Sequence, residues 1–197
     1  MFSANSKQVF WLEIEQIARL LAAAKQQDSI HWLAMLVAFN HHLRANEVVA
    51  ITPTCIADGK LVMKRSKRSN PVDDELVKHA NSLFNERDPM LELALKNARF
   101  NQRLFPISTR TFQRWVNAAG KLAGLPAMHC HPHILKHSSL RFLRRNGVDL
   151  DELQPRSGHK SLDSLKVYEG FSAQEAAPAV DAALSKISST LGLEFLN

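Results

Sequence analysis

The chain contains one tyrosine, Tyr168, which follows His159 by nine residues in the stretch SGHKSLDSLKVY at 157–168. A phenol has an unperturbed pKa of about 10, so it is a poor nucleophile near neutral pH. A tyrosine that attacks a substrate therefore needs cations and hydrogen-bond donors close to its hydroxyl. If Tyr168 is a nucleophile, the fold must bring such groups to it from elsewhere in the sequence.

The charge of the chain favours a polyanionic partner. Lys and Arg total 25 against 19 Asp and Glu, which gives a formal charge of +6 and a pI near 9.5. Five cations and no acid lie between Lys60 and Arg68. A basic surface of this kind suits nucleic acid, although a solvated basic face is the simpler alternative.

The remaining composition indicates one intracellular domain. A length of 197 residues suits a single core. The two cysteines, Cys55 and Cys130, form no disulfide framework, which favours a reducing cytoplasm. The sequence contains neither a long apolar run nor a signal-peptide pattern, so we expect no membrane association.

Apolar periodicity predicts a mainly α fold with a small antiparallel β-sheet. The sheet is expected around the Asp58-Gly59 turn, with a strand at 61–63, a basic turn at 64–69 and a return strand from Pro71. Helices are expected at 7–26, 29–40, 45–51, 73–84, 89–98, 109–122, 133–145, 149–156, 161–167 and 173–191.

Four short motifs resemble those of the tyrosine recombinases, or phage integrases, in their usual order. LRANEVVAI at 43–51 resembles the first arginine motif, and HPHILKHS at 131–138 resembles the second, usually H-x-L-R-H-S. NGVDL at 146–150 is similar to the stretch that follows it. SGH at 157–159 with Tyr168 resembles the closing L-G-H and tyrosine at the family's spacing. The resemblance runs from about residue 7 to 170 and implies a tyrosine recombinase catalytic-domain fold.

The resemblance also implies a chemistry. Attack on a DNA phosphodiester gives a pentacoordinate phosphorane with added negative charge, which fixed cations and donors stabilise by several kcal/mol. In this family the tyrosine forms a covalent 3'-phosphotyrosine, and a lysine protonates the departing oxygen. No metal, other cofactor or ATP is expected.

Carried onto this sequence, the resemblance implies a catalytic set. Arg44 is the first phosphate clamp, although an ordinary salt bridge is its alternative, and Glu47 is expected to brace it. Lys67 in the basic turn is the candidate general acid, with Lys64 second, unless this run only follows the DNA backbone. The catalytic set is Tyr168, Arg44, Lys67, His133, Lys136 and His159, and the DNA-binding set is Lys64, Arg65, Arg68, Arg141 and Lys160.

The sequence departs from the family in two respects. Lys136 stands where the second arginine is usual, which keeps the charge but loses the bidentate fork. The chain reads as a single catalytic domain over 1–197, without the family's N-terminal core-binding domain. The expected partner is double-stranded DNA. We expect a homotetramer on DNA, and a monomer is the alternative for the protein without DNA. The helical segment at 171–197 is expected to dock on a neighbour or on its own domain.

Two other functions remain open. Loss of the second arginine could leave a DNA-binding or regulatory protein without catalysis. Alternatively, the dense group His129, Cys130, His131 and His133 could bind zinc, although structural zinc sites usually draw ligand pairs from two separated places.

Overall fold

The computed structural model describes residues 10–65, 69–98 and 102–168. Its elements are helices α1 (Ile14–Gln27), α2 (Ser29–Asn40), α3 (Ala45–Val48), α4 (Arg87–Ala98), α5 (Thr109–Leu122), α6 (Pro132–Arg145) and α7 (Leu150–Ser157), strands β1 (Ile56–Ala57), β2 (Lys60–Met63) and β3 (Val72–Glu75), and 3-10 turns η1 (Pro53–Cys55), η2 (Ala127–His129), η3 (Leu162–Ser164) and η4 (Lys166–Tyr168).

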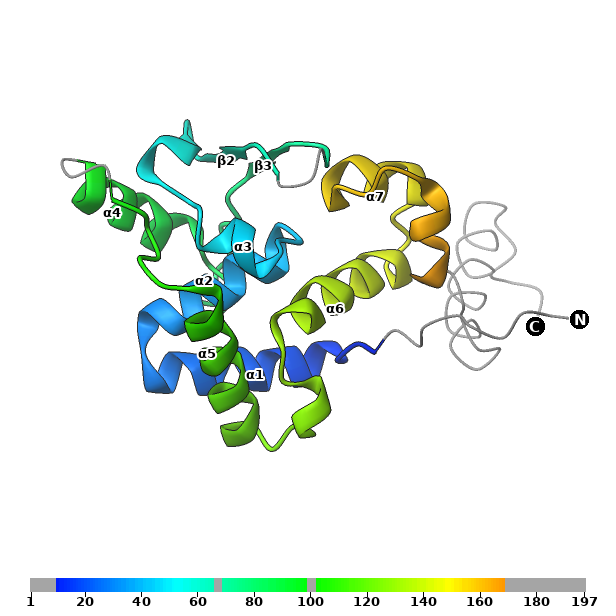
Figure 1. Ribbon diagram of the computed structural model, residues 1–197, viewed down its shortest axis with the longest axis horizontal. Helices are drawn as coiled ribbons and strands as arrows, with labels where there is room; N and C mark the ends of the chain where they lie inside the picture. The colour runs from blue at the N-terminus through cyan, green and yellow to red at the C-terminus, as the bar shows by residue number, and fades with distance from the viewer. Residues whose placement is uncertain (1–9, 66–68, 99–101, 169–197) are drawn as a thin grey trace, which may run out of the picture.

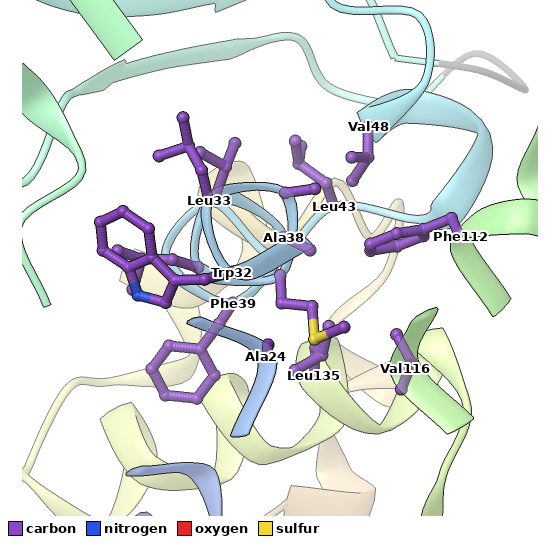
Figure 2. Packing of buried hydrophobic residues seen from close by; sticks show 14 of the residues in the cluster. Ala24, Trp32, Leu33, Ala38, Phe39, Leu43, Val48, Phe112, Val116 and Leu135 are labelled. Atoms are coloured by element: carbon purple, nitrogen blue, oxygen red, sulfur yellow. The ribbon is translucent and has the colours of Figure 1, made fainter. Parts of the chain in front are cut away.

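Helix α2 forms the centre of the core. Every residue from Trp32 to Phe39 is buried, as expected for a helix that is apolar on all sides. It packs against α1, α5 and α6. Figure 2 shows Phe112 and Val116 of α5 and Leu135 of α6 around it. The prediction of a buried helix at 29–40 is therefore confirmed.

Helix α1 begins later than predicted, at Ile14. The side chain of Gln16 accepts a hydrogen bond from the Glu13 N–H, which caps the first turn. The backbone N–H of Leu12 donates to Ser138 Oγ at 2.7 Å. Because this contact fixes the segment before Glu13 along α6, residues 10–13 do not continue the helix.

The small sheet is antiparallel with the order β1-β2-β3. Asp58 and Gly59 occupy the left-handed region, with φ of 51° and 76°, as their hairpin turn requires. The predicted helix at 73–84 is wrong, because Asp73 and Asp74 pair with β2. Cross-strand hydrogen bonds outweigh the weak helical preference of this polar segment. The sheet lies along one side of the molecule, and its β3 strand contacts α7 (Figure 1).

Helices α5, α6 and α7 lie close to their predicted ranges. Gly147 follows α6 with φ of 86°, the left-handed conformation that glycine favours after a helix. Beyond α7, the chain forms η3 and η4 in place of the expected helix at 161–167. A second apolar cluster forms there, around Leu140, Leu153, Leu165 and Tyr168.

Some predictions fall outside the described residues, namely the helix at 173–191 and the positions Lys67 and Arg68. Within the described ranges, no helix combines the length and apolar character needed to cross a membrane.

Candidate active site

Arg44 lies at the N-terminus of the short helix α3 and is held by Glu47. The Glu47 carboxylate accepts hydrogen bonds from the Arg44 backbone N–H at 2.8 Å and from its Nη1 at 3.2 Å. The Arg44 side chain remains 27% exposed. The predicted bracing by Glu47 is confirmed, and it leaves part of the guanidinium open to solvent.

Helix α6 carries His133 and, one turn later, the adjacent residues Lys136 and His137. Lys136 is 3% exposed, and its Nζ donates to the carbonyl of Ser157 at 2.7 Å. Burial, with Arg44 and Arg65 nearby, lowers its pKa to about 7. A lysine at this position can therefore gain or lose its charge near neutral pH, which an arginine cannot do.

Tyr168 is 1% exposed, and its hydroxyl shares a hydrogen bond with Nδ1 of His137 at 2.5 Å. Burial raises the pKa of the phenol above its ordinary value. The pKa of His137 falls to about 4 through burial and the nearby His133 and Lys136. Both partners are therefore uncharged at neutral pH, and an uncharged imidazole can accept the phenolic proton.

His137 was missing from the catalytic set predicted from the sequence. It belongs to the motif at 131–138, and it lies four residues after His133, so both share one face of a helix. The two rings have centroids 6.3 Å apart. Helical spacing could have identified His137, but its contact with Tyr168 depends on how η4 returns to α6.

His159 follows the C-terminus of α7. Its Nδ1 and Ser157 Oγ lie 2.8 Å apart. Burial lowers the pKa of His159 to about 4, with further contributions from Lys136 and Arg44. The pKa of His133 is also lowered, by burial and then by Arg44 and Lys136. These shifts place His133, Lys136, His159 and Arg44 in one neighbourhood.

Two of the predicted DNA-binding residues are buried, which corrects the expectation for them. Arg65 is 7% exposed and donates to the carbonyls of His41 and His42. Arg141 is 2% exposed, donates to the carbonyl of Tyr168 at 3.0 Å and stacks over Trp11. Both guanidiniums donate hydrogen bonds to backbone carbonyl groups inside the protein, so these two side chains stabilise the fold.

Lys64 and Lys160 are exposed, in agreement with a surface role. Lys64 lies two residues before position 66, where a described range has just ended, and Lys160 follows His159. The roles of Lys67 and Arg68 stay predictions from the sequence.

The structure does not support the zinc alternative. Cys130 is buried, with its Sγ 3.3 Å from the carbonyl oxygen of Pro126, and the His129 ring packs against Phe10. Throughout the described ranges, no group of three or more His, Cys, Asp or Glu side chains is arranged to hold a metal ion. The four residues of this alternative all lie within those ranges.

Taken together, the residues form a cationic site with uncharged imidazoles and one buried phenol. Arg44 is partly exposed and can contact an anion directly, Lys136 is buried near it and adds positive potential, and His133 and His159 can donate hydrogen bonds. Tyr168 reaches this group through His137. Such an arrangement suits a phosphate diester under attack by a phenol.

Comparison with known proteins agrees with this chemistry. The phage integrase family matches residues 11–175. The tyrosine recombinase XerD of Caulobacter vibrioides is 26% identical over 185 residues, which cover 86% of this chain and 60% of the relative. The chain therefore spans about three fifths of that relative's length.

Solved structures have the same fold. XerH recombinase bound to palindromic difH substrate in a post-cleavage complex superposes with a TM-score of 0.71 at 19% identity, covering 91% of this chain and 55% of that one. A lambda integrase tetramer bound to a Holliday junction gives a TM-score of 0.61 at 22% identity, covering 82% and 50%. The predicted fold class is confirmed, and the chain belongs to the phage integrase family of tyrosine recombinases.

Proposed function

We propose that this protein cleaves and rejoins DNA strands as a tyrosine-type site-specific recombinase. The observation that carries the proposal is the pairing of Tyr168 with His137, one residue from Lys136 on the same helix. The uncharged imidazole at the phenolic oxygen is its nearest proton acceptor, and the negative charge of a bound phosphate would raise the low pKa of that imidazole. Lys136 directly precedes that acceptor on α6, and Arg44 lies near Lys136, so both cations can act on a phosphate bound there.

In the proposed reaction, the Tyr168 oxygen attacks the scissile phosphorus and its proton passes to the imidazole of His137. The bond between phosphorus and the 5' oxygen breaks, and this departing oxygen takes a proton from Lys67. The product is a 3'-phosphotyrosine and a free 5' hydroxyl. The reverse attack by a 5' hydroxyl restores the diester, so neither ATP nor a metal ion is consumed.

The charges developed in this step match the site. The phosphorane gains one negative charge, which Arg44 and protonated Lys136 stabilise, with hydrogen bonds from His133 and His159. In enzymes that stabilise an oxyanion, each well-placed donor lowers the barrier by about 3 kcal/mol.

The proposed partner is double-stranded DNA in the cytoplasm, bound by a homotetramer. The relatives that support this are XerH bound to difH substrate and a lambda integrase tetramer bound to a Holliday junction. We further propose that 1–197 acts as a catalytic domain, whose segment at 171–197 docks on a neighbouring protomer or on its own domain.

A DNA-binding protein without catalysis is the second candidate, and Lys136 favours it. Its ammonium donates to the Ser157 carbonyl and loses its charge near pH 7. Without that charge, the site holds less positive potential for the phosphorane.

A suicide substrate distinguishes these two functions. Duplexes from the DNA flanking the gene, together with a randomised duplex library, are nicked near each potential cleavage position so that the cleaved fragment diffuses away. A recombinase yields a covalent protein–DNA band on a denaturing gel, absent with Tyr168→Phe. Gel-shift binding without any covalent band would overturn the recombinase proposal and support the binding protein.

A further inference from the structure

Arg65, two residues after β2, is enclosed by three separate segments of the chain. Its side chain is 0% exposed. Nη1 donates to the carbonyl of His42 at 3.1 Å, and Nη2 donates to the carbonyls of His41 at 2.9 Å and Arg156 at 2.5 Å. One guanidinium therefore connects the loop before Arg44 with the last turn of α7.

The same guanidinium reaches Arg44 through Glu47. Arg65 Nη1 lies 3.4 Å from Oε2 of Glu47, the oxygen that accepts the Arg44 backbone N–H. The Glu47 side chain is 1% exposed, so its carboxylate is satisfied mainly by internal groups. Arg44 and Arg65 thus share one buried carboxylate.

Gly158 closes the other side of this arrangement. Its φ is +70°, and a Cβ built at this position would lie 2.7 Å from Cδ and 3.0 Å from Nε of Arg65. The turn leading to His159 therefore packs directly against the Arg65 side chain. No other residue type fits here without moving one of the two.

We propose that Arg65 is a positioning residue that fixes the Arg44 loop against the Gly158-His159 turn, so that both sides of the phosphate site keep their spacing. The role rests on the proposed function, since it concerns the reacting phosphate. Arg65 acts through Arg44 and His159, because its buried side chain leaves no surface for DNA.

An arginine is required because the carbonyls lie in different directions around a planar fork. The guanidinium offers five N–H donors in fixed geometry, while an ammonium offers three from one atom. Arg65→Lys keeps the charge beside Glu47 but cannot reach every carbonyl. The variant should therefore fold while its turn at Gly158 relaxes.

The experiment compares Arg65→Lys with a matched control, Arg145→Lys. Arg145 ends α6 and pairs with Glu13. Three quantities are measured for wild type and both variants: the salt dependence of DNA binding, the single-turnover rate of the suicide-substrate reaction, and the NMR titration of His159, assigned by loss of its signal in His159→Ala. Gly158→Ala, which disturbs the same contact from the opposite side, is the second test variant.

For Arg65→Lys, we expect cleavage about 100-fold slower, as for a displacement of about 1 Å in a catalytic site. DNA affinity and its salt slope should stay within error. The pKa of His159 should rise by at least about one unit as the turn opens to solvent, whereas the signal of the remote His79 should not change. Arg145→Lys should match wild type in all three.

Two results would overturn the role. An unchanged His159 titration in both test variants would show that Arg65 does not hold the turn. A salt slope reduced by about 0.9 with Arg65→Lys would mark a direct phosphate contact. If the wild-type protein forms no adduct, the recombinase proposal fails, but the His159 titration still decides whether Arg65 positions this turn.

Discussion

The hydroxyl of Tyr168 and Nδ1 of His137 lie 2.5 Å apart, in a contact that joins the last described turn of the chain to the helix carrying the phosphate-site cation Lys136. Tyr168, the proposed nucleophile, lies in an apolar cluster with Leu140, Leu153 and Leu165. Its own environment suppresses ionisation, because burial raises the phenol pKa. In the proposed mechanism, activation of Tyr168 therefore depends on the imidazole of His137 and on substrate binding.

Tyr168→Phe should abolish the covalent adduct and leave the fold intact. The change removes one hydroxyl and its hydrogen bond to His137, which costs about 0.5–1.5 kcal/mol of stability. The ring keeps its contacts in the apolar cluster. Denaturant unfolding and the suicide-substrate gel check the two parts, and an adduct with this variant would show that another residue attacks.

His137→Asn should slow adduct formation by about 10²–10⁴-fold, since proton transfer by a positioned base contributes that much. Its pKa of about 4 keeps the imidazole uncharged from pH 5 to 8, so this group adds no pH dependence there. His79→Asn, on an exposed loop, serves as the control. Equal single-turnover rates for wild type and His137→Asn would exclude His137 as the base.

Lys136→Arg should remove a pH dependence. With a pKa near 7, Lys136 loses its charge as pH rises from 7 to 9, so its contact with phosphate weakens by up to about tenfold per pH unit. Arginine stays charged across this range. Rates measured from pH 6 to 9 should fall for wild type and remain flat for Lys136→Arg.

Lys136 should also make the free energy of unfolding depend on pH, and this quantity should rise with pH where the reaction rate falls. Its folded pKa of about 7 lies below the unfolded value, so the unfolded chain holds more protons between about pH 7 and 10.5. The contribution of Lys136 to the free energy of unfolding therefore rises with pH in that window. Measured by urea unfolding, the free energy of unfolding of wild type should increase relative to that of Lys136→Met from pH 7 to pH 9. A difference between the two proteins that does not change with pH would contradict this.

His41 should stabilise the fold at low pH. Burial lowers its pKa, but Glu86 at 2.9 Å and Asp74 at 3.5 Å outweigh this effect and raise it to about 9. The raised pKa contributes stability fully below about pH 6.5, and this is lost as pH rises through 9. His41→Asn should cost about 3–5 kcal/mol at pH 6, as for a broken buried ion pair, and distinctly less at pH 9.5. A cost independent of pH would show that His41 is uncharged.

The helices could be predicted where apolar spacing and end signals agreed. Helix α2 is apolar on all sides and α5 follows the cap Ser108, whose Oγ accepts from the Thr111 N–H, so both ranges matched the structure. The helix predicted at 73–84 was wrong because the strand that forms there depends on pairing with residues 60–63, which lie earlier in the chain. Local preference does not contain that information.

The amino-acid sequence by itself determined the chemical types and their order: one phenol, the R-x-x-E motif at Arg44, the histidines of α6 and the G-H pair at 158–159. Only the tertiary structure decided which cations are exposed and which are buried. Arg65 and Arg141 look like surface charges in the sequence, yet each is buried on backbone carbonyls. Whether a guanidinium meets solvent or a carbonyl depends on segments up to 91 residues away, which no local pattern records.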